Sequence, residues 1–228
     1  MIRNCTLLLL TSLFFQQSYA GGVSLGSTRL VYPTSKEQIT LKIYNTDEKD
    51  NYLVQSWVSD VNNEKSKDFI VTPPLFVIKS GSDNLLKVVY VGDKSNLPQN
   101  MEKMFFLNSK VIPSLSEKEQ QIDNALLIST TTKIKLFIRP DSIKEDPFES
   151  YKMMKCNYDS EKIKVSNPSP FYMNLVSLSI NGSEVSAAET IPPMSSIYLN
   201  YKSKGSHLSF NFINDYGVQV KDRQCNLN

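Results

Sequence analysis

The chain has 228 residues, a formal net charge of +2 at pH 7, eight glycines and a single histidine. A charge so close to neutral argues against nucleic-acid binding, which normally shows a strong basic bias. Because a catalytic triad needs a base and a phosphate loop needs glycines, the lone His207 and the few glycines favour neither. We therefore predict no enzymatic activity, no small-molecule substrate and no cofactor.

Residues 1–20 have the pattern of a secretory signal peptide. Arg3 supplies a positive charge, residues 7–15 form a short apolar run, and 18–20 end with small residues where a cleavage site needs them. The apolar run is shorter than the ~20 residues of a membrane-spanning helix, so a retained anchor or a buried helix is the weaker interpretation. We expect cleavage after Ala20 and export to an oxidising compartment.

The cysteines fit that compartment. Cys5 leaves with the signal peptide, and Cys156 and Cys225 remain as an even pair. We predict a disulfide between them, with two buried thiols as the alternative. One histidine and no CxxC pair make a metal site improbable.

The rest of the chain reads as β-strands. Apolar and polar residues alternate with a period of two in 39–44, 53–58 and 208–212, which predicts strands with one buried face. The run 85–91 is apolar nearly throughout, so we expect both of its faces to be covered. Short strands separated by turn residues are typical of all-β sandwiches.

The chain divides into two predicted domains. A long strand, about residues 126 to 138, ends before Arg139-Pro140-Asp141, and a polar stretch follows it. We place the domains at 21–140 and 146–228. The polar segment 114–124 reads as an exposed loop that runs into apolar strand residues, which suits an edge strand meant to pair with a partner.

Five motifs in order make the chain resemble the PapD-like periplasmic chaperones of the chaperone–usher pathway. The resemblance covers essentially the whole chain after the signal peptide. The motifs are Val23-Ser24-Leu25 through Thr28-Arg29, Thr72-Pro73-Pro74, residues 132–140 ending in Lys135-Leu136-Phe137-Ile138-Arg139-Pro140, Asn167-Pro168-Ser169-Pro170-Phe171-Tyr172, and Ile213-Asn214-Asp215-Tyr216-Gly217.

The resemblance implies two immunoglobulin-like β-sandwich domains joined at an angle, with a cleft between them, in the bacterial periplasm. Such chaperones lend a strand to pilus or fimbrial subunits, which lack their last strand, and deliver them to an outer-membrane usher. The donor residues would be Ile122, Leu126 and Ile128. Leu127 competes for this role from the opposite face, and the alternative places all of these side chains in the chain's own core.

The resemblance also assigns a pair of anchoring cations. Residues at the positions of Arg29 and Lys135 sit in the family's cleft and bind the subunit's C-terminal carboxylate. A guanidinium and an ammonium offer several donors to two carboxylate oxygens. Lys133 lies on the same face as Lys135 and is the rival candidate, and two ordinary surface charges are the plainer interpretation.

Two further groups of residues follow from the resemblance. Glu102, Arg139 and Asp215 match an interdomain ion network with a structural role. An usher-facing surface on the first domain would contain Leu53, Gln55, Thr72, Pro73, Ile112 and Pro113, although Leu53 and Ile112 suit a core position nearly as well.

Two alternatives to a pilus chaperone remain at this point. The chain could be a two-domain adhesin or pilus subunit, or an assembly factor for a surface fibre other than a pilus. A chaperone should be soluble and monomeric alone, whereas a subunit should aggregate or polymerise. The resemblance leaves open a self-capping dimer, and the absence of cysteine from the first domain favours the family's short-loop group.

Overall fold

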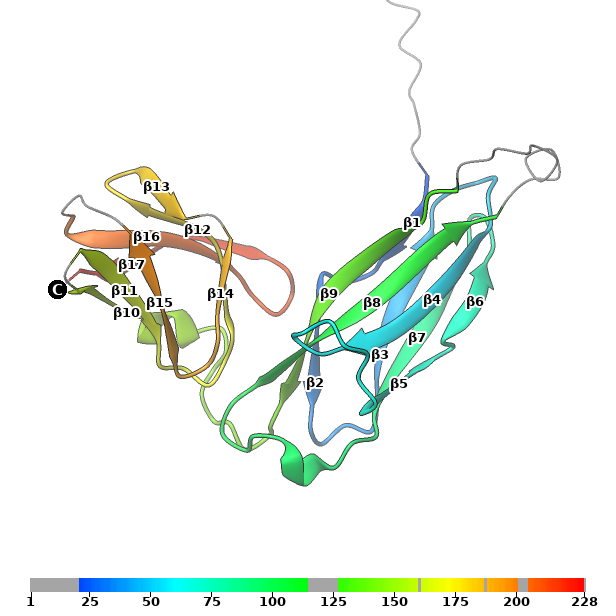
Figure 1. The fold of residues 1–228 in the computed structure, drawn as a ribbon, viewed down its shortest axis with the longest axis horizontal. Coiled ribbons are helices and arrows are strands. Elements are labelled where there is room, and N and C mark those ends of the chain that lie inside the picture. Colours follow the sequence, from blue (N-terminus) through cyan, green and yellow to red (C-terminus); the bar gives the residue numbers. More distant parts are fainter. Residues whose placement is uncertain (1–20, 115–126, 160, 187, 201–204, 228) are drawn as a thin grey trace, which may run out of the picture.

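The computed structural model describes residues 21–114, 127–159, 161–186, 188–200 and 205–227. The strands form two β-sandwiches that lie at an angle to each other and meet at one end (Figure 1). We call the sandwich of β1–β9 domain one and that of β10–β17 domain two. The predicted signal peptide and most of the predicted loop 114–124 lie outside the described residues.

Domain one packs a four-stranded sheet, in the order β1-β3-β7-β5, against a five-stranded sheet in the order β2-β9-β8-β4-β6. Within the second sheet, β2 runs parallel to β9, and β8 runs antiparallel to β9. The strands of domain one are β1 (Val23–Leu25), β2 (Arg29–Pro33), β3 (Ile39–Asn45), β4 (Tyr52–Ser59), β5 (Phe69–Thr72), β6 (Leu75–Ile78), β7 (Asp83–Tyr90), β8 (Lys103–Pro113) and β9 (Thr130–Arg139).

The alternation seen in the sequence fills the core of domain one. Leu41 and Ile43 of β3 are buried, as the period of two predicts, and Val54 and Val58 of β4 are buried beside them. The two sheets pack face to face, so every second side chain of each strand is buried between them.

The expectation that both faces of 85–91 are covered is wrong. Leu86 and Val88 are fully buried, but Leu85 is 51% exposed and Val91 is 50% exposed. The reason is that β7 lies in a sheet with only one partner sheet, and its other face is open to solvent.

The long strand before the domain boundary is shorter than predicted. β9 begins at Thr130 rather than near residue 126, and residues 127–129 have no regular secondary structure. β9 nevertheless ends at Arg139, directly before the proline, where the sequence predicts its end. A proline cannot continue the ladder because it has no N–H to donate.

Domain two packs the sheet β10-β11-β15 against a sheet that contains β13-β12-β16-β17, with β14 paired to β12. Its core includes Leu208, Phe210 and Phe212, the alternating residues predicted from the sequence. The strands are β10 (Lys155–Asp159), β11 (Lys162–Asn167), β12 (Met173–Ile180), β13 (Ser183–Ser186), β14 (Glu189–Ile191), β15 (Ser195–Asn200), β16 (His207–Ile213) and β17 (Gln219–Asn226).

A disulfide joins the two sheets of domain two at one edge. Cys156 on β10 and Cys225 on β17 are bonded, with their Cα atoms 5.8 Å apart. Both residues are buried in the domain core. The bond therefore ties the first strand of domain two to its last strand.

None of the helices in the described ranges is long and apolar enough to cross a membrane.

Candidate functional site

One face of β9 packs into the core of domain one, and the opposite face contacts domain two. Ile134, Leu136 and Ile138 point into the core of domain one. Lys135, Phe137 and Arg139 lie on the opposite face because side chains alternate along a strand. Each of them contacts domain two. This row is therefore the face of domain one that meets domain two.

The ion network predicted from the sequence lies at the junction end of this row. Arg139 bonds Glu102 through Nε at 2.7 Å and through Nη2 at 2.6 Å. On its other side Arg139 donates to the two Asp215 oxygens at 2.7 and 3.1 Å. Glu102 also accepts a hydrogen bond from the backbone N–H of Tyr172 at 2.9 Å. The structure therefore brings these three side chains together across the two domains.

Glu102 is the most deeply buried member of the network. Only 3% of it is exposed. Its desolvation raises the pKa of its carboxyl above the usual value, although Arg139 and the Tyr172 amide oppose the rise. Tyr172, whose backbone N–H binds Glu102, also packs against Phe137, with the two ring centroids 5.4 Å apart.

Arg29 and Lys135 stand directly opposite each other on β2 and β9. Lys135 Nζ donates to Asn174 Oδ1 at 2.6 Å and to Thr190 Oγ1 at 2.5 Å, both in domain two. Burial and the neighbouring Arg29 lower the pKa of Lys135 to about 8. The ammonium is thus held between the domains in a partly dehydrated, positively charged setting.

Arg29 is buried, with 7% of its surface exposed. Its Nη1 donates to the Ile213 carbonyl oxygen at 3.1 Å. Its Nε is buried and has no partner among the described residues. Burial lowers the pKa of Arg29, with Asp215 opposing the shift, yet a guanidinium stays charged in proteins. The site therefore holds two cations and an unused donor.

Lys133, the rival candidate, points to other partners. Its Nζ donates to Asn63 Oδ1 and lies 3.8 Å from the centroid of the Phe106 ring. The residue is exposed, and both partners belong to domain one. The structure therefore pairs Arg29 with Lys135 rather than with Lys133.

Part of β9 has an edge that none of the described strands covers. β8 pairs with β9 along one side from Thr130 to Ile138. On the other side β2 pairs only from Lys135 to Arg139. Residues 130–134 therefore present unpaired backbone groups on that side, within the described part of the chain. Such an edge is a template for a further strand.

Ile122 and Leu126, two of the three predicted donor residues, lie outside the described residues. Ile128 is described, and it is 66% exposed just before β9, while Leu127 is 46% exposed. Neither side chain belongs to the core of domain one. The alternative interpretation of Ile128 as a core residue is therefore wrong.

Three of the residues predicted to face an usher, Leu53, Gln55 and Ile112, lie on the neighbouring strands β4 and β8 of domain one. Leu53 stands opposite both Val77 of β6 and Ile112 of β8, and Gln55 stands opposite Leu75. Leu53 and Ile112 are half-buried, whereas Leu75 is 54% and Val77 59% exposed. Thr72 is exposed, and Pro73 and Pro113 are half-buried.

Sequence reasoning missed Leu75 and Val77. Their alternation in a strand of four residues was visible, but the register that sets them beside Leu53 was not. It also missed Asn174 and Thr190, because their role depends on packing between domains.

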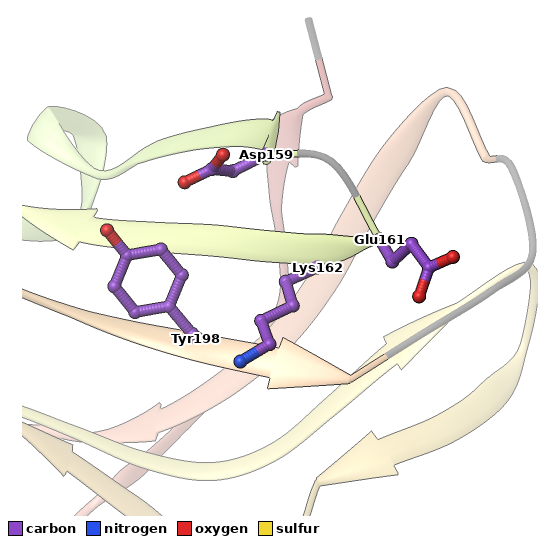
Figure 2. A pocket seen from close by; sticks show the side chains of 4 residues that line it. All are labelled: Asp159, Glu161, Lys162 and Tyr198. Atoms are coloured by element: carbon purple, nitrogen blue, oxygen red, sulfur yellow. The ribbon is translucent and has the colours of Figure 1, made fainter.

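A hollow of about 570 Å³ lies on domain two and is lined by Asp159, Glu161, Lys162 and Tyr198 (Figure 2). The two carboxylates point away from each other in Figure 2, so they do not converge on one point. No cluster of potential metal ligands occurs within the described ranges. His207 lies on β16 with its ring nitrogen 3.0 Å from the Ser206 hydroxyl.

The chain matches family models over both domains. Residues 22–144 match "Pili and flagellar-assembly chaperone, PapD N-terminal domain", and residues 150–224 match "Pili assembly chaperone PapD, C-terminal domain". The matched family is a chaperone family rather than an enzyme family.

Relatives of known name are similar over nearly the full chain. The chain is 37% identical over 207 residues to the "Probable fimbrial chaperone protein ElfD" of Escherichia coli O157:H7, covering 90% of this chain and 87% of that protein. It is 35% identical over 209 residues to the "Probable fimbrial chaperone SfmC" of Escherichia coli K12, covering 92% and 90%. A Salmonella enterica structure of the SafA pilin in complex with the SafB chaperone matches with a TM-score of 0.80 and 28% identity, covering 92% of this chain and 98% of the matched chain.

Proposed function

The chain belongs to the family of PapD-like pilus-assembly chaperones, and on that premise we propose how it handles a client. It is a fimbrial chaperone, as its relatives are named. Its client is a pilus or fimbrial subunit, the class of partner that SafB holds in the matched complex. Chaperones of this family are periplasmic, and cleavage after Ala20 would release this chain into that compartment.

The observation that carries the proposal is the uncovered edge of β9 next to two cations. β2 begins at Arg29, opposite Lys135, so β2 leaves residues 130–134 of β9 open. A client strand that pairs there would lie in line with β2 and would end where β2 begins. Strand addition of this kind draws its affinity from main-chain hydrogen bonds.

The cations give this strand a defined end and direction. A chain terminus carries a carboxylate, and the Arg29 fork and the Lys135 ammonium supply donors for it. With its C-terminal carboxylate at Lys135, the client strand would begin near Ile128 and end at Lys135. It would therefore run in the same direction as β9, and the anchored end would fix the register of pairing.

The donor residues fit this direction. Ile128 has the same parity as Ile134 and Leu136, the core-facing residues of β9. If β9 extends toward residue 126 when a client binds, Leu126 and Ile128 would enter the client's groove from one face, with Ile122 further along. Two buried aliphatic side chains would contribute about 1.5–3 kcal/mol each to binding.

The surface around Leu53 is our proposal for the usher-facing side. Its members are Leu53, Gln55, Thr72, Pro73, Leu75, Val77, Ile112 and Pro113. Exposed apolar residues in a contiguous patch mark interaction surfaces.

A self-capping dimer would use a different surface, the uncovered edge of β9. We retain this dimer as a competitor of the client for that edge. We keep 21–140 and 146–228 as the limits of the two domains.

The experiment compares client capture by three forms of the protein. The tagged chain, Lys135→Ala and the control Lys133→Ala are purified from the periplasm of the source cells, and co-purifying proteins are identified by mass spectrometry. We expect a small partner with the wild type and with Lys133→Ala, and its loss with Lys135→Ala. Equal recovery with Lys135→Ala would contradict the anchoring role.

A further inference from the structure

The two proposed anchoring cations are held from domain two by a matching pair of residues. Arg29 and Lys135 are directly opposite each other across β2 and β9. Asn174 and Thr190 are directly opposite each other across β12 and β14. Lys135 Nζ joins the two pairs, at 2.6 Å from Asn174 Oδ1 and 2.5 Å from Thr190 Oγ1.

The acceptors at this site are neutral. Lys135 contacts an amide and a hydroxyl, and Arg29 contacts the Ile213 carbonyl at 3.1 Å. The field of Asp215 reaches Arg29, but Asp215 already accepts two hydrogen bonds from Arg139. The two cations are therefore oriented without being neutralised.

Two further observations agree with an unbalanced positive charge. Arg29 Nε is buried without a partner in the described part of the chain. The pKa of Lys135 is lowered to about 8 by burial and by Arg29. An ammonium has three N–H donors and two are used here, so one donor remains available to a ligand. Among the described residues, no carboxylate forms a hydrogen bond with Arg29 or Lys135.

We propose that Asn174 and Thr190 are positioning residues of the carboxylate site, which hold Lys135 Nζ beside Arg29 through neutral contacts and leave its charge available for the client's C-terminus. This inference rests on the anchoring role proposed above. A lysine side chain has a flexible four-carbon stem, so an ammonium that is not held in this way would spread over many positions.

The neutrality of residue 174 is the critical feature. Asn174→Asp is nearly isosteric and would place a carboxylate where Oδ1 already contacts Lys135. The internal ion pair would strengthen the contact between the domains and compete with the client's carboxylate for the same ammonium. The free protein should therefore become more stable while client binding weakens. Misfolding would lower both the stability of the free protein and its affinity for the client. A rise in stability with a fall in affinity therefore identifies competition by the new carboxylate.

The test uses the purified mature chain and a synthetic peptide. The probe has two lysines, then ten residues of alternating threonine and valine, and ends in either a free carboxylate or an amide. Calorimetry gives its affinity for the wild type, Asn174→Asp, Thr190→Val and Thr190→Ser, and thermal unfolding gives each midpoint at pH 7. Asn157→Asp, an exposed position on β10, adds the same charge elsewhere as a control.

We expect the wild type and Asn157→Asp to prefer the carboxylate peptide. Asn174→Asp should reduce that preference about ten-fold, a change of about 1.4 kcal/mol, and raise the midpoint by about 2–4 °C. Thr190→Val should weaken the preference, and Thr190→Ser should restore it because the hydroxyl remains.

The outcomes separate the inference from the function on which it depends. If Asn174→Asp keeps the wild-type preference while Lys135→Ala loses it, the positioning role is wrong and the anchoring role stands. If the wild type shows no preference for the carboxylate, or Lys135→Ala retains it, the anchoring role fails and the inference fails with it.

Discussion

Lys133 and Lys135 have the same side chain on the same face of one strand, yet they meet different surroundings. Lys133 is exposed and lies over the Phe106 ring, whereas Lys135 is enclosed by Arg29 and by residues of domain two. Desolvation and a like charge both disfavour the protonated form, which is why the pKa of Lys135 falls to about 8. The neighbours therefore distinguish Lys135, the lysine that we propose to bind a carboxylate, from Lys133.

The first prediction is a pH dependence of client binding. A bound carboxylate favours the ammonium form, so binding should raise the pKa of Lys135 from about 8 toward its usual value. The complex then holds more protons than the separate partners, and affinity should fall as pH rises above 8. Titration calorimetry in buffers of different ionisation enthalpy should show uptake of about half a proton at pH 8.

Lys135→Met provides the control for this titration. The variant lacks the titrating group, so its residual binding should release or take up no proton near pH 8. Proton uptake that persists in Lys135→Met would assign the effect to another group.

At the scale of the element, the two parts of β9 differ in how they are paired, and we propose a different role for each. Its C-terminal part, from Lys135 to Ile138, is paired on both sides, and Lys135 and Phe137 on this part contact domain two. Its N-terminal part is covered on one side only by the described strands. In the proposed function, the part that is paired on both sides positions the cations, and the half-paired part accepts a client strand.

We predict that Ile128→Asp weakens client binding about ten-fold or more, because a carboxylate cannot enter an apolar groove cheaply. Ile128 is 66% exposed, so the change should leave the thermal unfolding of the free protein unaltered. Leu127→Asp, of opposite parity, is the matched variant and should retain more binding. A stronger loss with Leu127→Asp would reverse the assigned parity of the donor strand.

The alternating elements could be predicted from the sequence, and their partners could not. The burial of Leu41 and Ile43 follows from periodicity alone. The prediction that both faces of 85–91 are covered is wrong, since Leu85 is exposed. The composition of a strand does not reveal whether a second layer covers its sheet. Arg29 and Lys135 were identified through motifs. Asn174 and Thr190, by contrast, come together through the pairing of β12 with β14, and they reach Lys135 only because the two domains pack against each other.

The disulfide is a second element-scale test. It closes a segment with a sequence separation of 69 between Cys156 and Cys225. Restricting the unfolded chain over such a loop contributes about 4 kcal/mol in the chain-entropy view. We expect Cys156→Ser/Cys225→Ser to lower the free energy of unfolding of domain two by about that amount, measured by urea denaturation. A midpoint equal to that of the oxidised wild type would contradict the expectation.

At the scale of the whole molecule, the angle between the domains decides whether Asn174 and Thr190 can reach Lys135. Arg139 joins the domains by bonding Glu102 on one side and Asp215 on the other. Such a network adds little to stability when its charges are desolvated, because the lost hydration offsets the attraction. The contacts are directional, however, so they can fix an orientation.

The last prediction concerns that orientation. Asp215→Asn removes a charge whose side chain is 24% exposed and leaves Arg139 bound to Glu102. Because partly exposed ion pairs contribute about 1 kcal/mol or less, each domain should unfold within about 2–4 °C of the wild type. The distance between spin labels placed on the two domains should, by contrast, become more broadly distributed. Asp146→Asn, at an exposed position where domain two begins, is the control.

A broader distribution would also loosen the contact from Lys135 to Asn174 and Thr190. Client binding should then weaken in Asp215→Asn although every group that touches the client is intact. An unchanged distance distribution together with unchanged client binding would show that the remaining contacts, such as Phe137 against Tyr172, set the angle without the ion network.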